Sequence, residues 1–202
     1  MPADSKPRES KRAATRARLV EAARDALIDG NGDFEMSQLA QRAGVSSGLA
    51  YHHFGSKAGI LAAVIDDFYD RVFAVLQMDV DANAPWADRE LQRFRAWVAF
   101  LYEEPIARIV FGKMGKTVEV VEVEARRHDE LIGFAQLNIE VGQQSGEIPE
   151  SIDTAIAAAA IIGALRQTTT QAFSQEKAPE ASYAANQLWA FISGALGLND
   201  SH

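Results

Sequence analysis

The chain has 202 residues, of which 48% are hydrophobic and 24% are charged, and it carries a net charge of −8 and no cysteine. This composition is typical of a folded globular protein, and it excludes a disulfide scaffold, cysteine-ligated zinc and thiol catalysis. No segment approaches the roughly 18 consecutive apolar residues of a membrane span, and the charged N-terminus lacks the apolar core of a signal peptide, so we expect a cytoplasmic protein with no membrane partner.

The charge is unevenly distributed along the chain. Residues 1–60 contain nine Lys or Arg and seven Asp or Glu, a net charge of +2, whereas residues 61–202 contain eleven and twenty-one, a net charge of −10. The N-terminal end is therefore suited to bind a polyanion that the rest of the chain would repel. A solvated basic tail in front of an acidic domain is equally compatible with the composition.

Helical periodicity dominates the first part of the chain. Apolar residues recur at steps of three and four before a break at Gly30 and Gly32, and glycine or serine marks each later boundary. Ser46 is a suitable N-cap for the third helix. The predicted helices span residues 16–29, 37–43, 46–53 and 56–76.

The remaining residues also follow a helical pattern. Residues 79–85 read as a connector, Pro105 interrupts the helix that begins at Trp86, and Gly112 and Gly115 mark a loose or kinked piece. No segment alternates with a period of two, so the predicted fold is all-α, with a small basic unit followed by a larger helical domain. The later helices are expected at about 117–144, 151–173 and 181–196.

Residues 37–54 (SQLAQRAGVSSGLAYHHF) have the spacing of a helix-turn-helix. Ala40 is small where the second helix must cross closely, and Gly44 can adopt the positive φ that a sharp turn requires. Val45 fills the corner between the two helices, and Ala50 faces the same core. The second helix of the pair would then present its first turns to solvent.

Residues 18–65 resemble the N-terminal domain of the TetR family of bacterial transcriptional regulators. The matching pieces are LVEAA (19–23), QLA (38–40), AGVS (43–46) and YHHFGSK (51–57). The resemblance implies a three-helix helix-turn-helix DNA-binding domain with a basic N-terminal arm at residues 1–57. It implies an effector-binding and dimerisation domain at residues 58–202.

The resemblance also implies roles for individual residues. Five residues of the second helix of the motif would face the major groove, Tyr51 and Lys57 would contact phosphates, and Arg16 and Arg18 would reach the DNA backbone from the arm. The residues implied to bind DNA are Arg16, Arg18, Ser37, Ser46, Ser47, Gly48, Leu49, Tyr51, His52 and Lys57.

Two residues depart from the family pattern. Glu35 stands where Ser or Thr is usual, and a carboxylate suits a helix N-terminus but cannot donate to a phosphate. Leu49 stands where Thr is common on the reading helix. An exposed leucine there favours a thymine methyl contact and an A·T-containing half-site; the alternative is that Leu49 packs against the first helix.

Aromatic residues of the larger domain suggest a ligand cavity, although the same residues at helical spacing are typical of an ordinary core. Residues 146–167 are similar to segments of TetR regulators that sense fatty acyl derivatives. The acidic domain offers few cations for a coenzyme A phosphate, so a small apolar or aromatic effector is an equal alternative. The candidate lining residues are Trp97, Phe100, Leu101, Phe111, Met114, Phe134 and Arg166.

The expected helix at 151–173 is apolar over more than one stripe, and its alanines and Gly163 permit close approach of another backbone. With the last helix it is predicted to form a four-helix interface with a second copy of the chain. The residues of the last helix expected there are Leu188, Trp189, Ile192 and Leu196, and a buried monomer core is the alternative.

No phosphate-binding loop, nucleophile elbow or HExxH motif occurs, and His52 and His53 point about 100° apart on a helix. We therefore expect no enzyme activity, catalytic residue, metal or cofactor. The sequence predicts a homodimeric, ligand-responsive repressor that a small apolar effector releases from a palindromic double-stranded DNA operator. The alternatives are a helical small-molecule carrier or a protein-binding adaptor without operator binding.

Overall fold

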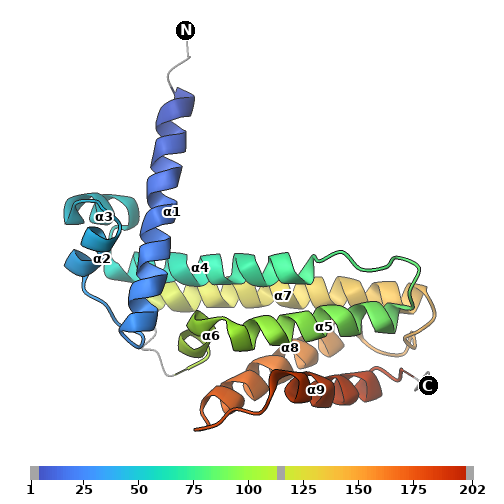
Figure 1. Cartoon of the computed structure of the whole chain (residues 1–202). Coiled ribbons are helices and arrows are strands. Elements are labelled where there is room, and N and C mark those ends of the chain that lie inside the picture. Colours follow the sequence, from blue (N-terminus) through green and yellow to red (C-terminus); the bar gives the residue numbers. More distant parts are fainter. Residues whose placement is uncertain (1–4, 113–116, 199–202) are drawn as a thin grey trace. The chain divides into compact units, whose positions relative to one another are not determined.

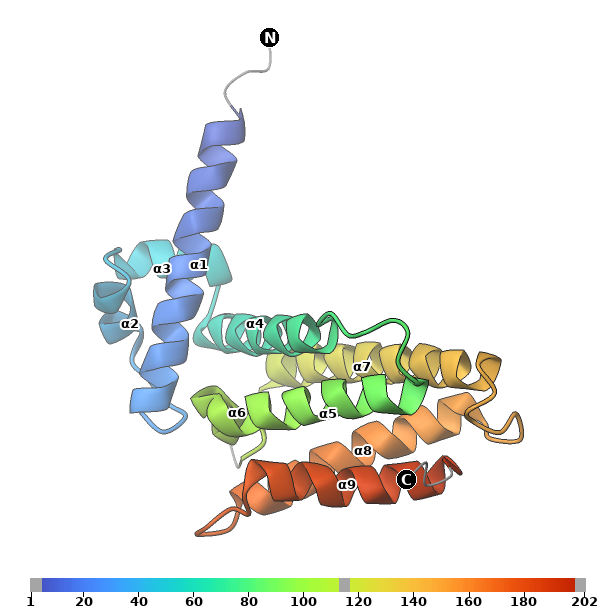
Figure 2. The ribbon, with the colours of Figure 1, turned by 45° about the vertical axis from the view of Figure 1, so that its right-hand side comes forward.

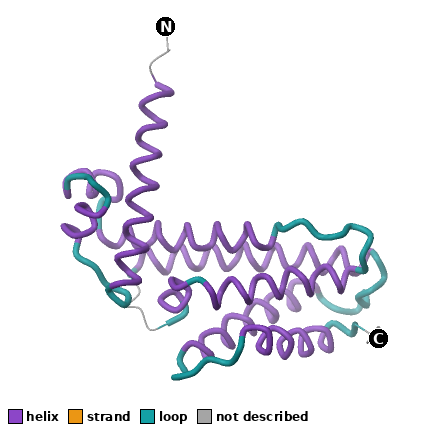
Figure 3. The backbone as a smooth tube through the Cα atoms, in the orientation of Figure 1, coloured by secondary structure: helices purple, strands orange, loops and turns teal. Residues whose placement is uncertain are grey.

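The computed structural model describes residues 5–112 and 117–198, although it leaves the side chains of residues 5–9 undescribed. All regular structure in these residues is helical, which confirms the all-α prediction (Figures 1 and 3). No described helix has the length and apolarity needed to cross a membrane. The helices are α1 Ser5–Asp29, α2 Met36–Arg42, α3 Ser47–Phe54, α4 Lys57–Leu76, α5 Trp86–Glu103, α6 Pro105–Val110, α7 Val118–Gln144, α8 Thr154–Phe173 and α9 Ala181–Ala195.

Two helices begin at different residues from those predicted. The helix α1 begins at Ser5 rather than at residue 16, because charged residues and alanine that favour a helix precede the apolar residues from which the start was read. The helix α8 begins at Thr154 rather than at residue 151, because the side chain of Asp153 accepts a hydrogen bond from the N–H of Ile156 and caps the helix. The predicted interruption at Pro105 is confirmed, since this proline is the first residue of α6.

The chain divides into two compact units. The first comprises residues 1–68 and 113–124, and the second comprises residues 69–112 and 125–202. The division falls inside α4, whereas the sequence placed the boundary after Lys57. Apolar residues such as Ile60 near the start of α4 are buried, so this part of the helix contributes to the core of the first unit.

The helices α1, α2 and α3 pack around a small apolar core in the first unit. Gly44 has a φ of 64°, as the sharp turn between α2 and α3 requires, and Ala40 and Ala50 are buried on either side of it. Val45 is half-buried at the same turn. The predicted helix-turn-helix geometry is therefore present, and it fixes which face of α3 points to solvent.

The second unit is a bundle in which α9 packs along α5 and α8 runs beside them (Figure 2). Its core is formed by apolar residues of α5 to α9 and of the α7–α8 connection, and many of them have exposed fractions of 4% or less. They include Val98, Leu101, Ile106, Ile139, Ile148, Ile162, Leu165 and Ile192.

The N-terminus of α5 is capped by a residue distant in the sequence. Pro85 precedes the helix and makes no side-chain cap, but the carboxylate of Glu147 accepts hydrogen bonds from the N–H groups of Trp86 (2.7 Å) and Ala87 (3.2 Å). Burial acts to raise the pKa of Glu147, but these hydrogen bonds, with one from Ser145, outweigh it and hold the pKa below its usual value. Glu147 therefore joins the α7–α8 connection to the start of α5.

Replacing Glu147 with alanine is expected to destabilise the protein by about 1 kcal/mol at neutral pH, because two backbone donors lose their acceptor. A depressed folded-state pKa stabilises the fold above the unfolded-state pKa, and this contribution is lost as the pH falls through the folded-state value. The difference between wild type and Glu147→Ala should therefore shrink in acid. Thermal unfolding followed by circular dichroism at several pH values measures it. The exposed Glu150 provides the control, and an equal effect of Glu150→Ala would contradict the capping role.

Candidate nucleic-acid interface

The exposed face of α3 is polar and anchored by a capped N-terminus. The hydroxyl of Ser46 accepts a hydrogen bond from the N–H of Leu49 at 3.2 Å, and Ala50 is fully buried behind the helix. Leu49 and Tyr51 are 37% and 47% exposed, so Leu49 is not sealed against another helix. Six residues predicted to bind DNA share this exposure, namely Ser46, Ser47, Gly48, Leu49, Tyr51 and His52.

Cationic side chains of α1 gather at the C-terminal end of α3. The guanidinium of Arg16 lies over the ring of Phe54, at 5.2 Å from its centroid. Desolvation lowers the pKa of His53, and the positive charges of Arg12, His52 and Arg16 lower it further. The end of α3 therefore lies beside two cationic side chains of α1, Arg12 and Arg16.

The predicted basic arm is helical over its described residues rather than extended. Arg12 and Arg16 lie four residues apart and share one face of α1. Arg18 is exposed, but it is two residues from Arg16 and points about 200° away from it around the helix. The structure thus brings Arg16 to α3 and not Arg18. Arg12 was not among the residues predicted to bind DNA, although its four-residue spacing from Arg16 places both on one face of a helix.

Lys57 is already engaged inside the first unit. Its ammonium forms an ion pair with Asp33 and lies 4.9 Å from the centroid of the Phe34 ring. The hydrogen bond from Lys57 and a second one from the N–H of Phe34 lower the pKa of Asp33. A phosphate contact by Lys57 would compete with this carboxylate.

The N-terminus of α2 lies in the same unit. Glu35 occupies its N-cap position without a side-chain hydrogen bond to the helix, and Ser37 is exposed in the first turn. A serine hydroxyl at this point can donate to an anion, which Glu35 cannot do.

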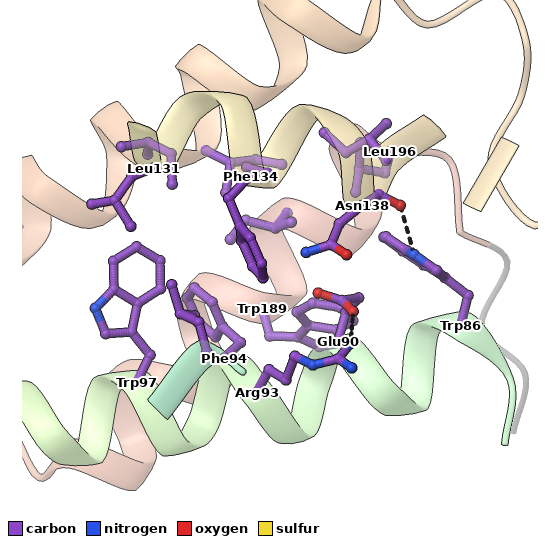
Figure 4. A pocket seen from close by; sticks show the side chains of 16 residues that line it. Trp86, Glu90, Arg93, Phe94, Trp97, Leu131, Phe134, Asn138, Trp189 and Leu196 are labelled. Carbon is purple, nitrogen blue, oxygen red and sulfur yellow. Dashed lines mark hydrogen bonds and ion pairs between the residues drawn. The ribbon is translucent and has the colours of Figure 1, made fainter. Parts of the chain in front are cut away.

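The second unit contains a pocket of about 70 Å³, shown in Figure 4. Trp97 and Phe134 of the predicted set line it. Phe100, Leu101, Phe111 and Arg166 are not among its lining residues, and Met114 lies outside the described residues. The lining residues are Leu76, Trp86, Glu90, Arg93, Phe94, Trp97, Leu131, Phe134, Ala135, Asn138, Ile139, Ile161, Ile162, Trp189, Ile192 and Leu196.

The predicted residues outside this lining pack elsewhere in the second unit. Leu101 is 1% exposed in the core, the ring of Phe111 meets that of Phe173 at 6.5 Å, and Arg71 lies over Phe100 at 5.9 Å. The sequence missed Trp86 and Trp189, because the helices that bring them to the pocket are far apart in the chain.

Three polar side chains interrupt the apolar pocket wall. Glu90 and Arg93, one turn apart on α5, form an ion pair, and Asn138 projects from α7. Burial raises the pKa of Glu90, and the neighbouring Arg93 opposes that shift. The indole N–H of Trp86 donates to the backbone oxygen of Asn138 at 2.8 Å, so it is already satisfied.

The apolar stripe of α9 that was expected to meet a second copy faces inward instead. Ile192 and Leu196 are each 2% exposed, and Trp189 lines the pocket. The large apolar residues exposed on these helices are Ile156 on α8 and Tyr183 and Phe191 on α9, and Ala159 and Ala160 of α8 are exposed as well. Ile192 and Leu196 thus match the alternative of a buried core, and Leu188 is half-buried. No cluster of three or more metal-ligating side chains occurs in the part of the chain that the structure describes.

Residues 19–64 match the sequence model of the bacterial regulatory proteins of the tetR family. The regulator UidR of Escherichia coli K12 is 25% identical over 194 residues, covering 90% of this chain and 93% of UidR. A TetR-family regulator from Pectobacterium atrosepticum has the same fold, with a TM-score of 0.72, 24% identity and coverage of 94% and 96% of the two chains. RolR in complex with resorcinol has a TM-score of 0.68, 21% identity and coverage of 96% and 97%. Together with the helix-turn-helix geometry of α2 and α3, these matches support a TetR-family DNA-binding transcriptional regulator.

Proposed function

We propose that this regulator is a homodimeric repressor that leaves a palindromic operator when a small molecule occupies the pocket of its second unit. The observation that carries the proposal is the exposed polar face of α3, which lies beside the cations Arg12 and Arg16 of α1. A helix of this kind enters the major groove with its first turns, while neighbouring cations bind the phosphates.

The residues of α3 divide into two proposed roles. Ser46, Ser47, Gly48 and His52 lie on the face that would meet base edges, and Leu49 would contact a thymine methyl. Tyr51 would donate its hydroxyl to a phosphate, with Arg16 on the neighbouring backbone. Sequence preference would then come from the first turn of α3, and most of the affinity from its basic surroundings.

A second copy of the chain would meet the outward faces of α8 and α9, where Ile156, Tyr183 and Phe191 are exposed. A two-fold dimer presents two reading helices to half-sites about 34–36 Å apart, one helical turn of DNA. A pseudo-palindromic operator follows from that symmetry.

The pocket of the second unit is the proposed effector site. RolR, which has a similar fold, binds the small aromatic molecule resorcinol, and this supports an apolar or aromatic effector here. Leu76, the last residue of α4, lines the pocket, while α4 begins in the first unit. An effector weakens DNA binding only by the difference between its affinities for the DNA-competent and the released conformations.

Selection of bound sequences from random DNA tests this function. We expect enrichment of inverted half-sites containing A·T pairs, and an affinity that falls steeply with salt as phosphate contacts are lost. Repeating the selection with small aromatic molecules should reduce recovery. Recovery of random sequences, or an affinity that salt does not change, would contradict operator binding.

The ion pair between Lys57 and Asp33 gives a separate prediction. Asp33→Asn should raise operator affinity about threefold to tenfold, because it frees the ammonium of Lys57 and removes a nearby carboxylate. The slope of log affinity against log salt concentration should become steeper by about one unit, since Lys57 adds one phosphate contact. Fluorescence anisotropy with labelled operator at several salt concentrations measures both effects.

Asp25→Asn makes the same charge change at a residue of α1, where Asp25 pairs with Arg24. This control should alter the affinity less than Asp33→Asn does. Equal operator affinities of Asp33→Asn and wild type would show that Lys57 stabilises the fold and does not contact a DNA phosphate.

A further inference from the structure

We propose that the pocket of the second unit binds a neutral, single-ring aromatic molecule with a hydroxyl group, which Glu90 and Asn138 orient. The inference rests on the proposed function in that it names the chemical class of the effector. The walls, the charge balance, the hydrogen-bonding groups and the size of the pocket each support it.

The walls of the pocket are mainly aromatic. Trp86, Phe94 and Trp97 reach it from α5, Phe134 from α7 and Trp189 from α9 (Figure 4). The rings of Phe94 and Trp189 lie 6.1 Å apart at an angle of 44°, so they present tilted faces rather than one flat surface. Aromatic rings pack favourably against such faces and edges.

The charges in the pocket already balance each other. Glu90 and Arg93 form an ion pair in which both side chains are largely buried, with exposed fractions of 15% and 21%. An anionic or cationic ligand would lose its hydration on entry and find no net opposite charge to compensate it. The pocket therefore favours a neutral molecule over a carboxylate or an organic cation.

The side chains of Glu90 and Asn138 offer hydrogen-bonding groups to a ligand. Figure 4 shows the side-chain amide of Asn138 and the carboxylate of Glu90 directed toward the same space beside Phe134. Within the described residues the Asn138 side chain makes no hydrogen bond, and the ion pair with Arg93 uses one oxygen of Glu90. A ligand hydroxyl can donate to the other oxygen of Glu90 and accept from the amide N–H of Asn138.

The size of the pocket sets an upper limit on the ligand. Its volume is about 70 Å³, whereas an engineered cavity of about 150 Å³ accommodates one benzene ring. A single ring therefore enters only if the pocket widens, which requires the half-buried side chains of Phe134 and Trp189 to move. The sequence left open a fatty acyl effector and a small apolar or aromatic effector. The small volume of the pocket argues against the long acyl chain.

Ligand titrations of the full-length protein without DNA test the inference. All three tryptophans of the chain line the pocket, so their fluorescence reports its occupancy. Phenol should bind at least about tenfold more tightly than anisole, because anisole keeps the ring but cannot donate a hydrogen bond to Glu90. It should also bind more tightly than benzoate, benzyltrimethylammonium or octanoate. Tighter binding of any of these, or equal binding of anisole, would overturn the proposal.

Variants test the two orienting residues. Glu90→Gln should weaken phenol binding about tenfold and leave anisole binding unchanged, because anisole donates no hydrogen bond to Glu90. Asn138→Leu should weaken the binding of both ligands, because the oxygen of either one can accept from the Asn138 amide. Glu130→Gln removes a carboxylate from a surface ion pair on α7 and serves as the control. Unchanged phenol affinity in both pocket variants would overturn the assignment of Glu90 and Asn138 as the orienting residues. If a variant does not fold, the comparison of phenol with anisole on the unmodified chain still decides the ligand class. Because no DNA is present, failure here is distinct from failure to bind an operator.

Discussion

Replacing Gly48 with glutamate is expected to lower operator affinity by about a hundredfold or more, because like charges brought together at an interface cost several kcal/mol. Gly48 lies exposed in the first turn of α3, and no heavy atom lies within 4 Å of the position that a Cβ would occupy there. A carboxylate at this position fits the fold but would point toward the phosphates and base edges of bound DNA.

The thermal stability of Gly48→Glu should stay the same or rise, although its operator affinity falls. Glycine inside a helix costs roughly 0.5–1 kcal/mol relative to alanine, and an acidic side chain in the first turn is favourable. Gly48→Glu should therefore melt at the same or a higher temperature than wild type while losing DNA binding. Gly48→Gln adds a side chain of the same size without charge, so anisotropy titrations of the two variants separate charge from bulk. Equal affinities of Gly48→Glu and Gly48→Gln would show that this turn does not face DNA.

Replacing Phe191 with glutamate is expected to raise the dissociation constant of the dimer by at least about a hundredfold, because each copy would bury an unpaired carboxylate in the same interface. Phe191 is 65% exposed on α9 and does not line the pocket, so the substitution should leave the monomer folded. Sedimentation equilibrium over a range of concentrations measures the dissociation constant.

The matched control is Leu137→Glu, since Leu137 is 63% exposed on α7 and lies outside the proposed interface. This variant should remain dimeric. A dimer that survives Phe191→Glu, or one that dissociates with Leu137→Glu, would contradict a dimer interface on α8 and α9. Operator binding by Phe191→Glu should also weaken strongly, since a monomer binds only one half-site at a time.

The helix-turn-helix was predictable because single residues carry its special backbone requirements. Gly44 supplies the positive φ of the turn, Ser46 supplies the N-cap of α3, and Ala50 is small enough to be buried behind it. Each of these properties depends on one residue and its immediate neighbours. Local sequence therefore specified the orientation of α3, and the exposure of most of the predicted DNA-binding residues followed from it.

The arrangement of the second unit was less predictable, because it depends on contacts between distant segments. The apolar pattern of α9 did not distinguish the inner residues Trp189 and Ile192 from the outer residue Phe191. Phe100 and Phe111 were expected to line the cavity with Trp97 as part of one aromatic set, but they pack elsewhere. The pocket draws residues from five helices, and no local pattern specifies such a set.

The double attachment of Trp86 has a consequence for the synthesis of the chain. Its backbone N–H bonds to Glu147 and its indole N–H to the oxygen of Asn138, which lie 61 and 52 residues further along. On a translating ribosome, α5 emerges well before either acceptor exists, so its first turn stays uncapped until α7 and the following connection have left the exit tunnel. The second unit of the nascent polypeptide therefore completes its fold only after Glu147 has been synthesised, later than the helices α1, α2 and α3 of the first unit.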